Sequence, residues 1–133
     1  MIHAVIDTNV LVSALISHNP NAATVRIMEL VLDGTIVPVY ERDIITEYSE
    51  VLCRPKFHLN EADVFQLVEY FQQYGVEASR VKYNDDMPDE DDRVFYEISL
   101  GMPDSYLVTG NQKHFPVTPR VVTPAQMLEI IKM

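Results

Sequence analysis

Three acidic side chains stand at points where separate segments of the chain can bring carboxylate oxygens together. Asp7 ends the apolar run 2–6, Glu47 lies in a helical segment, and Asp92 opens another helical segment. Carboxylates from separate elements suit Mg²⁺ or Mn²⁺, which keep several waters and contact substrate phosphate. Such an ion polarises a phosphoryl oxygen and acidifies a bound water. The three positions therefore predict a metal-dependent hydrolytic site.

Two of these positions also have simpler explanations. Asp7 followed by Thr8 and Asn9 is a common sequence for an Asx turn that caps a helix, and spacing alone leaves both roles open. The run 89–92 is acidic throughout and can be a solvated loop that favours a helix N-terminus. Within it Asp92 is preferred to Asp91, because it precedes Phe95 by three residues and shares its helical side. Asp89 and Glu90 are assigned to solvent.

Glu47 has acidic competitors on its own helix. Glu41, Asp43 and Glu50 are close in sequence, and an exposed helical Glu is usually solvated. Glu47 is nevertheless favoured, because it lies next to Tyr48 and close to Ile45, on the apolar side of the helix.

Apolar runs and helical periodicities alternate along the chain. Short apolar runs predict strands at 2–6, 36–40, 78–83, 106–109 and 120–122. Helical spacing and capping residues predict helices at 10–16, 21–32, 41–52, 60–74, from the acidic stretch 84–92 through Leu100, and 123–131. This alternation predicts an α/β fold with a mainly parallel central sheet covered on both faces. The carboxyl ends of its strands are where ligands bind, and Asp7 is placed there.

Composition limits the class of protein. A chain of 133 residues with 47% hydrophobic residues can bury one core, so we expect a single domain over residues 1–133. The single cysteine, Cys53, excludes an internal disulfide and, without a signal-like segment at Met1, predicts a cytoplasmic setting. No apolar stretch approaches the roughly 20 residues of a membrane span. The net charge of −10 repels nucleic acid at long range, although a bound metal inverts the field locally.

Four segments resemble, in order, the motifs of PIN domains. Residues 6–14 (IDTNVLVSA) resemble the opening motif, and 47–57 resemble the central acidic helix with the Arg-Pro-Lys-Phe ending of one bacterial branch. Residues 89–95 resemble the acidic third motif, and 106–111 resemble the closing motif. The resemblance implies a Rossmann-like, three-layer fold and a metal-dependent ribonuclease. This branch is commonly described as the toxin of toxin–antitoxin pairs.

The resemblance also implies roles for individual residues. It makes Asp7, Glu47 and Asp92 catalytic metal ligands, and it gives Thr8, Asn9 and Thr109 supporting polar roles. Asn111 takes the place of a further ligand, where the motif usually has Asp. An amide coordinates through oxygen but brings no charge, which predicts weaker binding of a second ion or dependence on Mn²⁺. Asp104 is a candidate to compensate.

Basic residues near these motifs are candidates for phosphate contacts. Arg54, Lys56, Arg93 and Lys113 are expected to position an RNA backbone, although scattered surface charge explains them equally well. His114 is expected to be a structural or substrate-edge residue. Cys53 is expected in the core, and the aromatic residues Tyr70, Phe71 and Tyr74 in the core or an oligomer contact.

We therefore expect an endoribonuclease that uses Mg²⁺ or Mn²⁺, acts on RNA, forms a homodimer and, as a toxin, is blocked by an antitoxin protein. Two alternatives stay open. A catalytically silent PIN-fold binding module would also fit, because Asn111 departs from the motif. A phosphate-handling domain of the response-regulator type would need a phosphoacceptor Asp and a Lys after a late strand, for which Lys113 is the only candidate.

Overall fold

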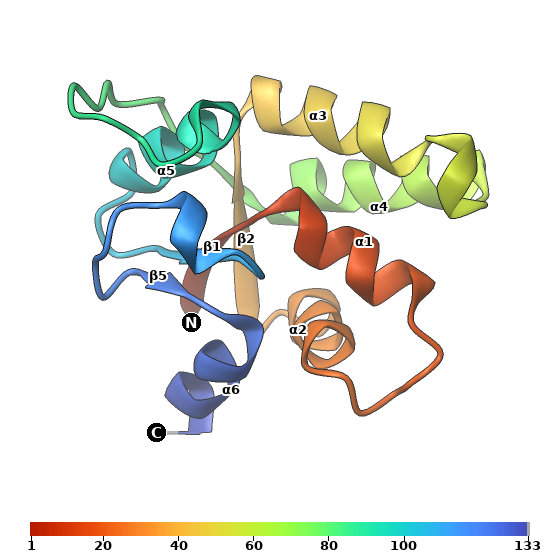
Figure 1. Ribbon diagram of the computed structural model, residues 1–133. Helices are drawn as coiled ribbons and strands as arrows, with labels where there is room; N and C mark the ends of the chain where they lie inside the picture. Colours follow the sequence, from red (N-terminus) through yellow and green to blue (C-terminus); the bar gives the residue numbers. More distant parts are fainter. Residues whose placement is uncertain (133) are drawn as a thin grey trace.

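The computed structural model describes residues 1–132, which build a five-stranded parallel sheet flanked by six helices (Figure 1). The strand order is β3-β2-β1-β4-β5, and every neighbouring pair is parallel. The predicted α/β fold class is therefore confirmed. The strands are β1 (Ile2–Ile6), β2 (Ile36–Tyr40), β3 (Val76–Glu77), β4 (Tyr106–Val108) and β5 (Val121–Val122). The α-helices are α1 (Thr8–Ile16), α2 (Ala23–Leu32), α3 (Arg42–Leu52), α4 (Glu61–Tyr74), α5 (Arg93–Leu100) and α6 (Pro124–Lys132). Three short 3₁₀ helices are η1 (Pro55–Phe57), η2 (Glu90–Asp92) and η3 (Gln112–His114).

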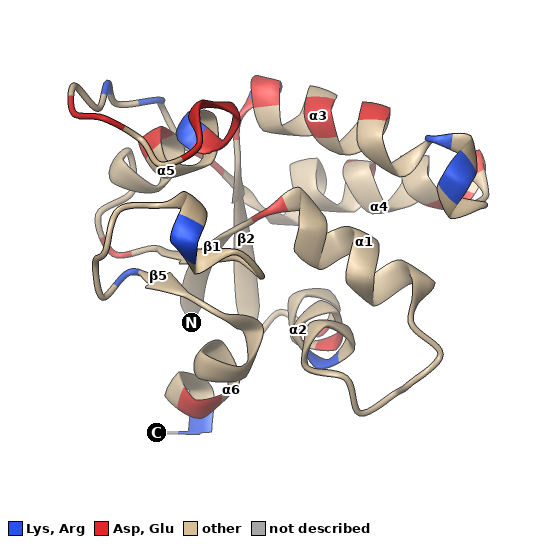
Figure 2. Cartoon of the chain, in the orientation of Figure 1, with Lys and Arg blue, Asp and Glu red and all other residues tan. Residues whose placement is uncertain are grey.

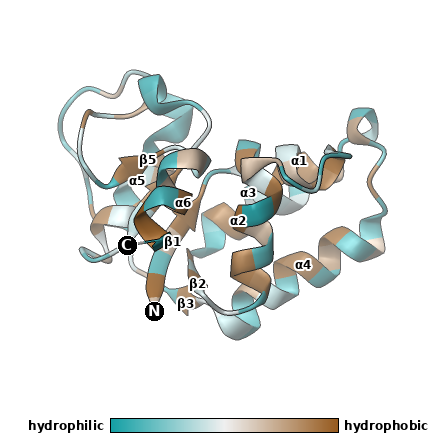
Figure 3. Cartoon of the chain, turned by 90° about the horizontal axis from the view of Figure 1, so that it is seen from below, coloured by the Kyte–Doolittle hydropathy of each residue, from teal (hydrophilic) through white to brown (hydrophobic). Residues whose placement is uncertain are grey.

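The helices pack on the sheet through their apolar faces. Helix α2 contacts β2, α1 and α6, whereas α3 packs against α4 and α5, and α5 lies against β1 and β4. Hydrophobic residues concentrate on the central strands and the helix faces turned toward them, while the outer loops are mostly hydrophilic (Figure 3). No helix among residues 1–132 combines the length and apolarity needed to cross a membrane.

The third strand is shorter and earlier than predicted. The run 78–83 was expected to form it, but the strand is Val76–Glu77, paired with the end of β2. Gly75 allows this early pairing, because a Cβ there would lie 2.3 Å from the Phe71 carbonyl oxygen and 2.5 Å from that of Pro38. Beyond Ala78 the chain leaves β2 and turns to α5, where Val81 donates its amide to the Glu97 carbonyl.

The side chain of Tyr48 ties α3 to the carboxyl end of β1. Its hydroxyl donates a hydrogen bond to the carbonyl of Ile6, and its ring is buried edge-on against Phe71 at a centroid distance of 5.5 Å. Ile6 immediately precedes Asp7, and Tyr48 immediately follows Glu47. One buried contact therefore sets the spacing between the elements that carry these two carboxylates.

Of the aromatic residues on α4, Phe71 lies in the core, Tyr70 is half-buried and donates to the carbonyls of Val31 and Leu32, and Tyr74 is exposed. Cys53 was expected in the core, but it is only partly buried and packs against the core from its edge.

We predict that Tyr48→Phe lowers the free energy of unfolding by about 1–3 kcal/mol, because the Ile6 carbonyl loses its buried hydroxyl donor. Equilibrium urea unfolding followed by circular dichroism measures the change. The matched control is Tyr74→Phe, whose side chain is exposed. A loss no larger in Tyr48→Phe than in the control would contradict this role.

Candidate metal centre

A cleft of about 520 Å³ opens where β1 and β4 end. Acidic and polar residues and apolar residues both line it. The acidic and polar residues are Asp7, Thr8, Asn9, Ser13, Asp89, Asp91, Asp92, Asn111 and His114, and the apolar residues are Val12, Ile16, Val51 and Phe57.

Asp7 is buried at the floor of this cleft. Its backbone amide donates to the Val108 carbonyl at 2.9 Å, which continues the pairing of β1 with β4, and its Oδ2 accepts the Thr109 hydroxyl at 2.8 Å. The residue also occupies the N-cap position of α1, and its place in the cleft does not exclude a role at the start of that helix. Burial raises the pKa of Asp7 to about 6, and the charges of Asp92 and Glu47 add to this rise.

Glu47 reaches the site from the half-buried side of α3. The Thr8 hydroxyl donates to Glu47 Oε2, which links the start of α1 to α3. Burial raises the pKa of Glu47, as does the negative charge of Asp92, while Arg54 opposes the rise.

Asp92 ends η2 and is half-buried. Its Oδ2 lies 3.0 Å from His114 Nδ1. Burial raises the pKa of Asp92, and the charges of Asp89 and Asp91 also raise it, whereas His114 counteracts them.

The three predicted carboxylates therefore share one electrostatic environment, although they come from three elements. The charge of Asp92 raises the pKa of both Asp7 and Glu47. Over residues 1–132, no Lys or Arg side chain forms an ion pair with any of the three. A partly buried cluster of carboxylates without a cationic partner is what a divalent ion neutralises.

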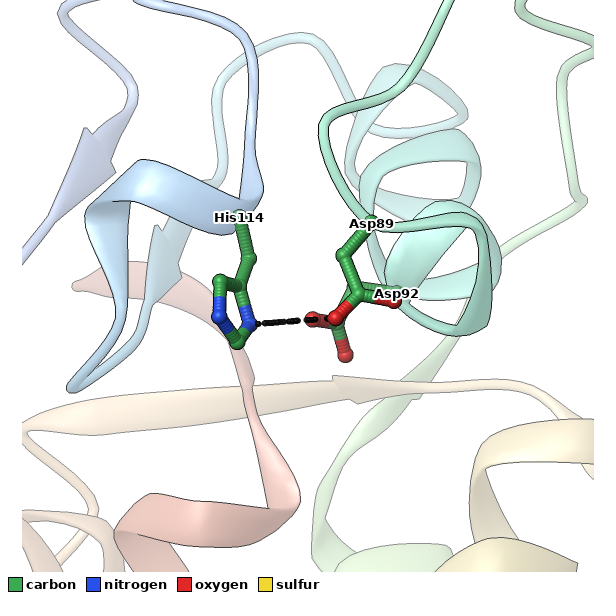
Figure 4. Close-up of side chains that lie close together, drawn as sticks. All are labelled: Asp89, Asp92 and His114. Carbon is green, nitrogen blue, oxygen red and sulfur yellow. Dashed lines mark hydrogen bonds and ion pairs between the residues drawn. The ribbon is translucent and has the colours of Figure 1, made fainter.

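The tightest group of ligand atoms is a different one. Asp89, Asp92 and His114 each place one ligand atom within 4.8 Å of the others, and within residues 1–132 this is the sole such group of three (Figure 4). The assignment of Asp89 to solvent was wrong. Its Oδ1 accepts the Asp91 amide at 3.0 Å, and this bond caps η2 and holds the side chain in the cleft. Glu90 is exposed and pairs with Arg93 at 2.7 Å.

The sequence predicted a structural or substrate-edge role for His114, and its contact with Asp92 was not foreseen. The signal available was its position in the turn just after β4, since that turn starts from the same sheet edge as Asp7.

The supporting polar residues join the ends of β1 and β4. Thr8 and Thr109 donate to Glu47 and Asp7, and Asn9 Oδ1 accepts the Gly110 amide at 3.3 Å. Asn111 is exposed at the cleft, and its backbone amide donates to Thr109 Oγ1 at 3.0 Å.

Asp104 lies on the other edge of the sheet. It precedes the amino end of β4, in a separate hollow with Tyr106 and Arg120. Because the strands are parallel, this edge is opposite the one that carries Asp7. The idea that Asp104 compensates for Asn111 was wrong.

The four predicted phosphate contacts fall into two groups. Arg54 and Lys56 are exposed in and beside η1, at the end of α3, and Lys113 is exposed on η3 (Figure 2). Lys56 Nζ lies 5.1 Å from the ring centroid of Phe57, which lines the cleft. Arg93 is instead engaged within the chain, where it bonds to Glu90 and to the carbonyls of Tyr83 and Asp85. It therefore holds the loop 83–90 in place.

Comparison with known families gives one match. A sequence profile described as PIN domain matches residues 3–113. No curated protein and no solved structure matches the chain. The matched region contains Asp7, Glu47, Asp92 and Asn111, and it ends just before His114.

We predict that Asp7→Asn stabilises the metal-free protein at pH 7.5. The pKa of Asp7 is 3.8 ordinarily and about 6 in the fold, so the folded state binds more protons between these values. Stability is therefore lost as pH rises through this window, by about 3 kcal/mol at neutral pH. The variant cannot ionise and avoids this loss.

Urea unfolding in EDTA from pH 4 to 8 tests the prediction, with Asp104→Asn as the matched control. The gap between Asp7→Asn and wild type should shrink toward pH 4. Equal stabilities at pH 7.5 would refute the prediction.

Proposed function

This chain belongs to the PIN-domain family, and we propose that it is a metal-dependent endoribonuclease with Asp7, Glu47 and Asp92 as its catalytic ligands. PIN domains are generally nucleases, which supports hydrolase activity at a coarse level. The observation that carries the proposal is the convergence of three carboxylates from separate elements, each with a raised pKa and none paired with Lys or Arg within residues 1–132.

The donor set fits a hard divalent ion such as Mg²⁺ or Mn²⁺. Asp7 and Asp92 line a solvent-open cleft, and Glu47 is joined to the cleft residue Thr8 by a hydrogen bond. Ions of this kind keep several waters in their coordination shell. When bound, the ion supplies a Lewis acid for the phosphoryl oxygen and an acidified water. Thr109 donates to one oxygen of Asp7 and Thr8 donates to one oxygen of Glu47, and these bonds orient the two carboxylates.

The apolar residues of the cleft support a single-stranded RNA substrate. Phe57 and Val51 offer a surface for an unstacked base, and duplex RNA does not expose its base faces. Arg54 and Lys56 lie in and beside η1, which also carries Phe57, and Lys113 precedes the cleft residue His114 on η3. From these positions they can contact backbone phosphates. These local cations offset the repulsion expected from a net charge of −10.

A toxin role, with an antitoxin protein that covers the cleft, extends this proposal. It stays a prediction from the sequence resemblance, as do a homodimer and a cytoplasmic location. Growth arrest on expression, relieved by Asp7→Asn, would support the toxin role, and light scattering of the purified protein measures the oligomeric state.

We predict that the purified protein cleaves labelled single-stranded RNA with Mn²⁺ or Mg²⁺ but not in EDTA. Asp7→Asn, Glu47→Gln and Asp92→Asn should each slow cleavage on the order of 100-fold or more, because each removes negative charge that would hold the cation that stabilises the transition state. Asp104→Asn makes the same chemical change at the opposite edge and should cleave like wild type.

Equal cleavage by Asp7→Asn and wild type would indicate a contaminating nuclease. If the folded protein cleaves with neither ion, the silent binding module becomes the better description.

We also predict that Arg54→Gln and Lys56→Gln each weaken RNA binding several-fold and reduce the salt dependence of affinity by about one counterion per lost phosphate contact. Fluorescence anisotropy with the non-cleaving Asp92→Asn protein as background measures both quantities. Lys132→Gln, on α6, serves as the charge-matched control. Salt slopes unchanged from the control would exclude η1 from the RNA path.

A further inference from the structure

Asp89, Asp92 and His114 form a compact group on one side of the cleft. His114 Nδ1 lies 3.0 Å from Asp92 Oδ2 and 3.5 Å from Asp89 Oδ2 (Figure 4). The aspartates come from the start and the end of η2, and the histidine comes from the end of η3. Two segments that are separate in sequence therefore aim three ligating atoms at one point, beside Asp7 and Glu47 rather than among them.

The donor set of this group differs from that of the neighbouring carboxylates. Asp7 and Glu47 offer only oxygen, whereas His114 adds an imidazole nitrogen. Oxygen ligands alone suit Mg²⁺, whereas imidazole suits borderline ions such as Zn²⁺, Fe²⁺ and Ni²⁺. We infer that Asp89, Asp92 and His114 form a cation site of their own, which takes a first-row transition ion of the Zn²⁺ or Co²⁺ type in preference to Mg²⁺.

An ion pair with His114 does not account for the negative charge of Asp89 and Asp92. The three side chains are exposed by 43% for His114, 37% for Asp89 and 18% for Asp92, and exposed ion pairs contribute little stability. One imidazolium also leaves a net negative charge on the pair of aspartates. Within residues 1–132 no Lys or Arg pairs with either of them. A cation neutralises this remaining charge.

The surrounding contacts hold the three ligands in place. The Asp91 amide binds Asp89 Oδ1 and leaves Oδ2 toward His114, and the His114 amide donates to the Asn111 carbonyl at 2.9 Å. Phe115, the next residue, is buried and fixes the end of η3. Outer contacts of this kind orient metal ligands, and three protein ligands leave positions open for water or substrate.

The site deepens the proposed function and in part rests on it. Asp92 belongs both to this group and to the three proposed catalytic carboxylates, so two cations would lie side by side in one cleft. His114 would then make the ion preference of the enzyme depend on a residue just beyond the matched region 3–113. Binding itself can be measured without any cleavage assay.

The test is a titration of the metal-free full chain with Co²⁺ in the presence of excess Mg²⁺, followed by visible absorption and by competition with Zn²⁺. We expect His114→Gln and Asp89→Asn each to weaken Co²⁺ binding by at least about tenfold. His18→Gln changes an imidazole outside the cleft and should bind like wild type. Asp104→Asn removes a carboxylate at the opposite edge of the sheet and should keep the Co²⁺ signal. Urea unfolding of each variant confirms that it is folded.

Two results would overturn the inference. One is the same Co²⁺ affinity in folded His114→Gln and in wild type, and the other is displacement of Co²⁺ by an equal concentration of Mg²⁺. The two proposals fail separately. If the protein binds Co²⁺ through His114 but cleaves no RNA, the cation site stands and the proposed nuclease activity is wrong. If the protein cleaves RNA with a metal but His114→Gln does not change Co²⁺ binding, the nuclease proposal stands and the cation site is wrong.

Discussion

The parallel pairing of β1 with β4 is the constraint on which the site depends. It places the first residue after each strand, Asp7 and Thr109, at one edge of the sheet, and their side chains hydrogen-bond across 102 positions of sequence. The Asp7 amide completes the same ladder through the Val108 carbonyl. A carboxylate is thereby fixed at the floor of the cleft by backbone geometry, and the other acidic residues are arranged around it.

This arrangement works against the stability of the metal-free chain. Removing a carboxylate from water costs free energy, and Asp7, Glu47 and Asp92 all have pKa values raised by burial. Contacts that carry no charge offset part of this cost, chiefly the Tyr48 hydroxyl on the Ile6 carbonyl. Carboxyl groups with shifted pKa values in a cleft are characteristic of functional sites. A fold that served stability alone would not bury them, because their burial costs free energy.

The distribution of charge matters more than the net charge of −10. Four aspartates, Asp7, Asp89, Asp91 and Asp92, line the cleft, while Arg54 and Lys56 lie in and beside η1, close to the cleft residue Phe57. Arg93 has a different role from these cations. It binds Glu90 and the carbonyls of Tyr83 and Asp85, so that it holds the loop that ends at Asp89. Arg93, which the sequence predicted to contact the substrate, therefore helps to position Asp89, a candidate metal ligand.

The sequence alone determined the α/β class, most of the helices and strands, and the placement of Asp7, because burial imposes periodicities of about two and 3.6 residues that local patterns record. Prediction from the sequence was wrong where the conformation of a segment depends on its packing against distant parts of the chain. Strand β3 begins at Val76 because Gly75 fits against Pro38, and the run 78–83 turns away to α5. Asp89 and His114 meet only because two loops without periodicity converge beside Asp92, which lies 22 residues from His114. The tertiary structure alone decided that meeting, since loop conformation follows from contacts with the rest of the fold and leaves no repeating pattern in the sequence.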